Sequence, residues 1–131
     1  MRVIERADRW SFTGLEEVDT LRFDHAVTVV VTGGPERAEI RIETRFRLAA
    51  REVWELEPDG ETASLAPVLP LLRQRVARLD VLKAGALELD LVGGASLTVP
   101  VSERYEAFTV AGPGQVLLVS MPGGDVAAWT S

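Results

Sequence analysis

The segment AEIRIETRFRL, residues 38–48, alternates between apolar and charged side chains along its length. Its apolar side chains share one parity, at Ile40, Ile42, Phe46 and Leu48, with Thr44 between them. Its charged side chains share the other parity, at Glu39, Arg41, Glu43, Arg45 and Arg47. Because successive side chains of a strand point to opposite faces of a sheet, the segment is predicted to form a strand with one buried and one wet face.

The same period of two recurs in other parts of the chain. The segment LELDLV, residues 87–92, alternates leucine with acidic residues, and AVTVVVT, residues 26–32, is rich in β-branched residues that suit a buried strand. SLTVPV, residues 96–101, also reads as a strand, but Pro100 cannot donate to a ladder and is expected at a strand end or a sheet edge. The pattern therefore predicts a mainly antiparallel β protein.

Glycine-rich turns separate these strands, and they raise the question of a phosphate-binding loop. Such a loop needs glycines that lead directly into a helix. The segments that follow Gly114 and Gly124 are VLLVS and VAAW, which are typical of strands instead. We therefore interpret these glycines as hairpin turns, where glycine reaches a positive φ without strain.

Two stretches of the chain resemble each other. VDTLRFDHAVTVVVTGGPERAEIRIE begins at Val18, and VARLDVLKAGALELDLVGGASLTVPV begins at Val76. Each has an apolar strand, a tight turn, a second strand, Gly-Gly and a third strand, which predicts one three-stranded meander used twice and paired about a pseudo-twofold axis. The alternative is that any β-meander resembles any other.

One segment breaks the period of two. SLAPVLPLLRQRVARL, which begins at Ser64, has Leu and Ala in place of β-branched residues, and Pro67 and Pro70 favour a short or kinked helix. The sequence thus predicts an α+β fold, mainly antiparallel β, in a single domain over residues 1–131. Its parts are a meander at about 16–48, a helix at about 65–73, a meander at about 76–101 and a C-terminal hairpin at about 104–129.

Composition limits the function classes. The chain carries 20 acidic and 14 basic residues, a net charge of −6, and an acidic surface repels a nucleic-acid backbone. The chain has no cysteine, which excludes disulfides and thiolate metal sites. No apolar run approaches the roughly 20 residues of a membrane helix. We therefore expect a cytoplasmic protein that binds neither nucleic acid nor membrane.

Catalytic and metal-binding patterns are weak. His25 is the single histidine, and with Asp24 beside it a Ser-His-Asp arrangement is conceivable, but both residues stand where a tight turn is expected. Without cysteine, a metal site would rest on carboxylates whose strand spacing is typical of a solvated face. We predict no catalytic residues, no metal and no cofactor, and leave open whether the protein is an enzyme, with the balance against it.

Two sets of residues are candidates for binding. The first is a basic strand face for an acidic partner, formed by Arg41, Arg45, Arg47 and Arg51. The alternative for that face is a solvated surface on which Glu39 and Glu43 pair with the arginines. The second set is expected to line a ligand pocket between the sheet and the helix, and consists of Trp54, Tyr105, Glu106 and Trp129.

The C-terminal segment YEAFTVAGPG…LLVSMPGGDVAAW resembles a family of short, mostly actinobacterial domains of unknown function. The family is marked by Tyr-Glu-Ala-aromatic, Gly-Pro, Pro-Gly-Gly and a closing Trp. The matching positions are Tyr105, Glu106, Ala107, Phe108, Gly112, Pro113, Pro122, Gly123, Gly124 and Trp129. The family more often has Trp where this chain has Phe108. The likeness spans about residues 15–129 and implies a small bacterial cytoplasmic protein, without implying a reaction.

These observations favour a non-enzymatic protein-interaction module, of an immunity type or a regulatory type, with an unidentified protein partner. A β-rich chain also has sheet edges to cover, so a homodimer is expected. The alternative is a small-molecule-binding protein or a cryptic enzyme, with its pocket between the sheet and the helix.

Overall fold

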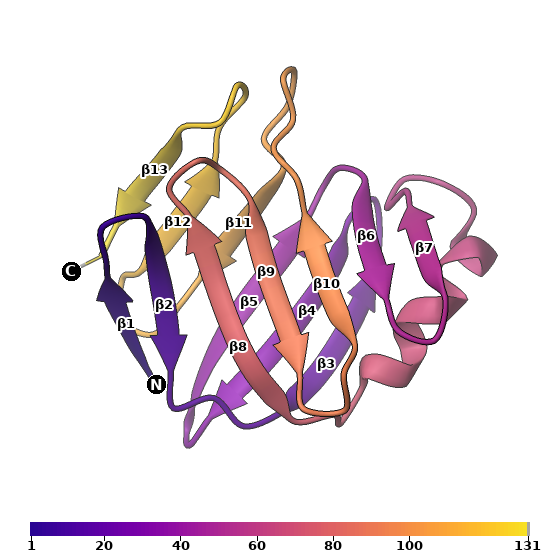
Figure 1. Ribbon diagram of the computed structural model, residues 1–131, viewed down its shortest axis with the longest axis horizontal. Helices are drawn as coiled ribbons and strands as arrows, with labels where there is room; N and C mark the ends of the chain where they lie inside the picture. Colours follow the sequence, from indigo (N-terminus) through magenta and orange to yellow (C-terminus); the bar gives the residue numbers. More distant parts are fainter. Residues whose placement is uncertain (131) are drawn as a thin grey trace.

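Two antiparallel sheets face each other in the computed structural model, which describes residues 1–130 (Figure 1). The seven-stranded sheet consists, in spatial order, of β1 (Arg2–Glu5), β2 (Arg9–Thr13), β8 (Val76–Leu82), β9 (Leu87–Leu91), β10 (Ser96–Val99), β6 (Phe46–Ala49) and β7 (Val53–Leu56). The six-stranded sheet consists of β13 (Val126–Trp129), β12 (Leu117–Ser120), β11 (Phe108–Ala111), β5 (Glu36–Ile42), β4 (Val27–Gly33) and β3 (Val18–Phe23). The mainly antiparallel β fold predicted from the sequence is confirmed.

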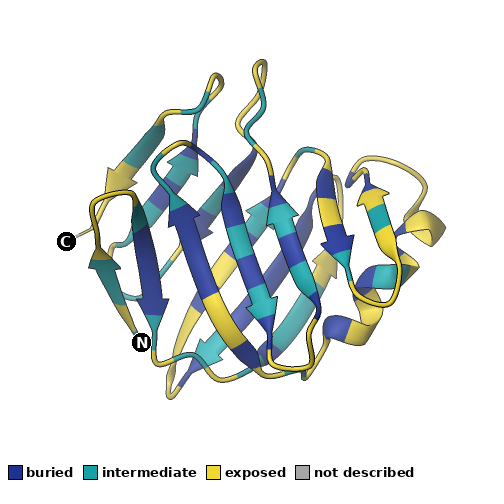
Figure 2. Ribbon diagram, in the orientation of Figure 1, coloured by how far each residue is buried: buried dark blue, intermediate teal, exposed yellow. Residues whose placement is uncertain are grey.

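The core lies between the sheets and follows from the period of two. On β9 the three leucines are buried while Glu88 and Asp90 remain half-exposed, which gives the alternating bands of Figure 2. On β4 even the outward-facing Thr28 and Val30 are buried. The buried residues of both sheets form one apolar cluster. The burial of apolar side chains from both inner faces stabilises the packing of one sheet on the other.

The prediction of one strand over residues 38–48 was wrong. The segment forms two strands, β5 and β6, which belong to different sheets, and the chain crosses between the sheets at residues 43–45. The crossing is fixed by Glu43, whose backbone N donates to the carbonyl O of Ala107 at 2.9 Å. The alternation continues across the break because both sheets bury their inward faces, so the pattern alone does not reveal the crossing.

Each sheet contains a meander of three consecutive antiparallel strands. The first is β3–β4–β5, and the second is β8–β9–β10. Each first strand has a register shift at its start, between Val18 and Thr20 in one and between Val76 and Arg78 in the other. The meanders also exchange equivalent hydrogen bonds, because Val18 N donates to Gln74 O at 2.9 Å and Val76 N donates to Glu16 O at 2.8 Å.

Each meander continues into the opposite sheet. The chain leaves β5 to form β6, which pairs with β10, and it leaves β10 to form β11, which pairs with β5. Neither sheet is therefore built from one half of the chain.

The helix predicted near residues 65–73 begins and ends earlier, and it is a 3₁₀-helix, η1 (Thr62–Leu71). Pro67 and Pro70 lie inside it and lack the backbone N–H that an α-helix interior requires. Leu72 N instead donates to Leu69 O three residues back, at 3.2 Å. No helix formed by residues 1–130 is long and apolar enough to cross a membrane.

The single hairpin predicted over residues 104–129 was incomplete, since this region contains three strands, β11, β12 and β13. The segments after Gly114 and Gly124 form β12 and β13, as the hairpin interpretation of these glycines predicts. Gly124, at a φ of 114°, also packs against a second turn, where a Cβ on Gly85 would lie 2.7 Å from the Gly124 carbonyl O. These glycines therefore allow a close backbone approach.

Candidate functional site

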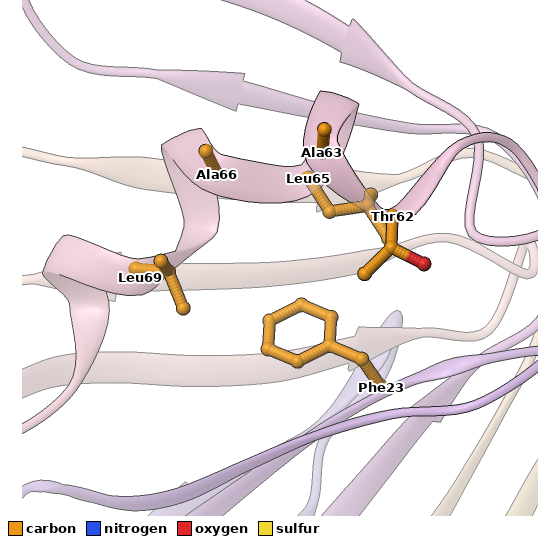
Figure 3. A pocket seen from close by; sticks show the side chains of 6 residues that line it. All are labelled: Phe23, Thr62, Ala63, Leu65, Ala66 and Leu69. Carbon is orange, nitrogen blue, oxygen red and sulfur yellow. The ribbon is translucent and has the colours of Figure 1, made fainter.

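A small apolar pocket lies between η1 and β3, at one edge of the six-stranded sheet (Figure 3). Its volume is about 200 Å³. Its lining comes from one residue of β3 and from one side of the helix: Phe23, Thr62, Ala63, Leu65, Ala66 and Leu69. The ring of Phe23 faces the helix across the pocket, as Figure 3 shows. The pocket thus lies between sheet and helix, where a ligand pocket was expected, but other residues line it.

The three-residue period of the 3₁₀-helix explains this lining. In such a helix, side chains three residues apart lie directly above one another. One row, Leu65, Val68 and Leu71, is buried in the core. A second row, Ala63, Ala66 and Leu69, lines the pocket, and the two alanines have small side chains. The third row, Ser64, Pro67 and Pro70, carries the two prolines.

The pocket adjoins a free sheet edge. β3 is the last strand of the six-stranded sheet and pairs with β4 alone. Outside that ladder, the backbone bonds of β3 among residues 1–130 are confined to Val18, which bonds to Gln74 and Arg73. The backbone from Thr20 to Phe23 is thus unpaired on the side next to the pocket. The rim is apolar as well, because Leu69 is 56% exposed and Leu72 is exposed.

The pocket and the free edge of β3 together form a groove between β3 and η1. Polar groups lie at both of its ends. At the Phe23 end, His25 Nδ1 lies 3.3 Å from Asp59 Oδ1, and both side chains are exposed. The neighbouring Asp24 accepts a hydrogen bond from Ala26 N at 2.8 Å, and this bond, together with Arg41, lowers the pKa of the Asp24 carboxyl. The turn interpretation of residues 24 and 25 thus matches the geometry.

At the other end of the groove stands Arg73, which follows η1. Its φ of 72° is the only positive value at a non-glycine position among residues 1–130. A bulky residue in the left-handed region carries strain, and strain of this kind clusters at functional sites. Arg73 is exposed and forms no ion pair within the described part of the chain.

The four predicted ligand-binding residues do not meet at one site. Trp54 is half-buried on β7 and Trp129 is exposed on β13, and these strands lie at opposite ends of the molecule (Figure 1). Tyr105 and Glu106 lie together on the β10–β11 loop, where they line an open hollow with Glu43, Arg104 and Pro122. The loop is held by Ser102, whose hydroxyl accepts from the backbone N of Tyr105 at 3.1 Å.

The predicted arginine face is divided between the two sheets. Arg41 lies on β5 and Arg47 on β6, so their side chains lie on the outer faces of different sheets. Three of the four arginines already have acidic partners: Arg41 with Asp24 at 3.3 Å, Arg45 with Glu57 at 2.9 Å and Arg47 with Glu55 at 3.9 Å. Arg51 is exposed at the turn between β6 and β7, beside a hollow lined by Gln74, Gly93 and Gly94.

The densest charge lies elsewhere, on the outer face of the seven-stranded sheet. Asp80, which is nearly buried, accepts a hydrogen bond from Arg9 at 3.0 Å and lies 3.6 Å from Arg78. Arg9 also binds Asp8, and these two carboxylates raise the pKa of its guanidinium. Glu88 and Asp90 also pair with these arginines, so that each charged side chain of the network has an opposite charge beside it. Within residues 1–130, no group of three or more His, Cys, Asp or Glu is arranged to hold a metal ion.

The residues of the pocket were not singled out by sequence reasoning. The available signal was the spacing of Ala63, Ala66 and Leu69, with prolines at 67 and 70, which indicates a three-residue period.

The comparisons with known proteins identify a family for this chain. No curated protein and no solved structure matches the chain. Residues 12–130 match the model of a family described as a family of unknown function (DUF6188), and the chain belongs to that family.

Proposed function

We propose that this protein is a non-enzymatic protein-interaction module, of an immunity or regulatory type, that binds an extended segment of a partner along β3. The observation that carries the proposal is the apolar pocket beside an unpaired sheet edge. In strand addition, main-chain hydrogen bonds to the edge supply affinity, and pockets for alternate side chains supply specificity. The groove between β3 and η1 offers both elements.

The size and charge of the groove define the segment that it would take. An apolar cavity of about 150 Å³ holds a benzene molecule, so a pocket of about 200 Å³ suits one leucine-sized or phenylalanine-sized side chain. Arg73 at the end of the groove supplies a cation for an acidic residue of the partner. The expected ligand is a β-forming segment with one large apolar residue and an acidic residue to one side of it.

A random peptide display library, selected on the purified protein, tests this function. We expect enrichment of peptides with that pattern and at least a tenfold loss of their affinity in Ala66→Glu, which places a carboxylate in the pocket. Ala84→Glu is the matched control, since Ala84 is also an exposed alanine but lies on the turn between β8 and β9. Amide hydrogen exchange on the complex should show new protection at Thr20–Phe23. Equal binding by Ala66→Glu, or no peptide above background, would contradict the proposal.

The same pocket supports the second candidate, a small-molecule-binding protein, because its walls are almost entirely apolar. A small apolar ligand would lose affinity in Ala66→Glu as well, but it would leave the exchange of the β3 amides unchanged. Native mass spectrometry of the protein purified from its native source, combined with the exchange data, therefore separates the two functions. A small molecule retained by the protein, without slower amide exchange on β3, would favour the small-molecule-binding function.

A further inference from the structure

The two sheets end in edge strands of different character. Three of them carry charged residues: Arg2 and Glu5 on β1, Asp19 and Arg22 on β3, and Glu55 on β7. The fourth, β13, has the sequence VAAW and carries none. Trp129 on this strand is 56% exposed. An uncharged, exposed edge strand is a template for strand pairing.

The sheet face next to this edge is uncharged too. The β12–β13 register pairs Leu117 with Trp129 and Leu118 with Ala128. Because Leu118 is buried in the core, Leu117 and Trp129 lie on the outer face. The same parity places only uncharged residues on the outer face of the last three strands: Thr109, Ala111, Leu117, Val119, Ala127 and Trp129. The outer face of β3–β5 carries Arg22, Glu39 and Arg41 instead.

We propose that β13 pairs antiparallel with β13 of a second copy, which joins the two six-stranded sheets across a twofold axis. Residues directly opposite each other in an antiparallel pair point to the same face. A register with Ala128 on the axis meets this condition and sets Trp129 of each copy opposite Ala127 of the other. This pairing matches a large side chain with a small one, so both strands keep their spacing.

The uncharged edge admits a second copy where the rest of the surface would repel it. Each chain has a net charge of −6, so two copies repel each other over most of their surfaces. At β13 the two copies meet without opposing any like charges. An isologous contact of this kind also closes as a dimer and does not extend into a filament. The proposal does not rest on the function proposed for β3, which is the opposite edge of the same sheet.

A cysteine cross-link tests the register directly, because the chain has no cysteine of its own. On the twofold axis, the two copies of residue 128 lie within disulfide distance. We expect Ala128→Cys to form a covalent dimer under mild oxidation, on a non-reducing gel. Val53→Cys is the matched control, since Val53 is also exposed on an edge strand, β7, and this variant should stay monomeric.

A charge exchange provides the second measurement. Ala128→Lys and Ala128→Glu each place like charges directly opposite each other across the axis, so each variant should be a monomer. Size-exclusion chromatography with light scattering measures the mass. The original chain should have twice the 14.3 kDa of one copy. Mixing the two variants should restore the dimer. A monomeric original chain, a dimeric Ala128→Lys variant or a mixture that stays monomeric would overturn the proposal. Peptide binding at β3 would survive each of these outcomes.

Discussion

At the residue scale, the glycines of the Pro-Gly-Gly turn show why the sequence motif exists in this fold. Gly85 and Gly124 approach backbone to backbone, and the hydroxyl of the buried Ser120 donates to the Gly85 carbonyl O at 2.6 Å. A Cβ on Gly85 would meet three backbone atoms of Gly124 within 3.0 Å. Backbone atoms cannot move aside as the end of a side chain does, so the two turns would have to separate.

Gly85→Ala should therefore lower the free energy of unfolding by more than the strain of an alanine at positive φ. Gly94 is the matched control, because its φ of 103° is close to the 110° of Gly85, yet a Cβ there meets nothing within 4 Å. Both alanine variants carry backbone strain of about 1–3 kcal/mol. The clash should add about 2 kcal/mol in Gly85→Ala. Urea unfolding measures the difference, and equal midpoints for the two variants would contradict the close approach.

At the scale of the element, the three rows of η1 make a prediction that an α-helix would not. Leu65 and Leu69 would share one face of an α-helix, but in the 3₁₀-helix they belong to the core row and the pocket row, with exposures of 3% and 56%. Leu65→Ala should lower the free energy of unfolding by about 2–5 kcal/mol. Leu69→Ala should change it by less than about 0.5 kcal/mol. Thermal unfolding of both variants checks this, and similar losses would show that both leucines face the core.

The same elements show what the sequence could and could not predict. The alternation on β4, β5 and β9 indicated their inward faces correctly, because burial of one side of a sheet imposes a period of two. The predicted ends of the helix lie within three residues of the observed ends. That it is a 3₁₀-helix and not an α-helix depends on Pro67 and Pro70 together. The pocket is lined by Phe23 on one side and by helix residues such as Ala63 and Ala66 on the other, and the approach of segments about 40 residues apart is a property of the fold.

At the scale of the whole molecule, the chain crosses between the sheets three times, and two of these crossings exchange strands between the meanders in a way that no local pattern contains. Residues 43–45 and the β10–β11 loop carry the chain from one sheet to the other, and β6 and β11 each pair with the last strand of the other meander. The inward faces stay in phase across the crossing at residues 43–45, and for that reason residues 38–48 read as one strand. For the same reason, the sequence did not show that Arg41 and Arg47 lie on different sheets.

This exchange of strands predicts that the chain folds as one unit and that its halves reassemble. A break between Asp59 and Gly60, both exposed, separates β1–β7 from η1 and β8–β13. Each sheet then draws strands from both fragments, so neither fragment alone can bury the inward faces of a complete sheet. Co-expressed fragments 1–59 and 60–131 should co-purify and give the dispersed amide spectrum of the intact chain, while each fragment alone should give the narrow spectrum of an unfolded chain. Cooperative unfolding of either fragment by itself would show instead that one meander with its hairpin forms a core of its own.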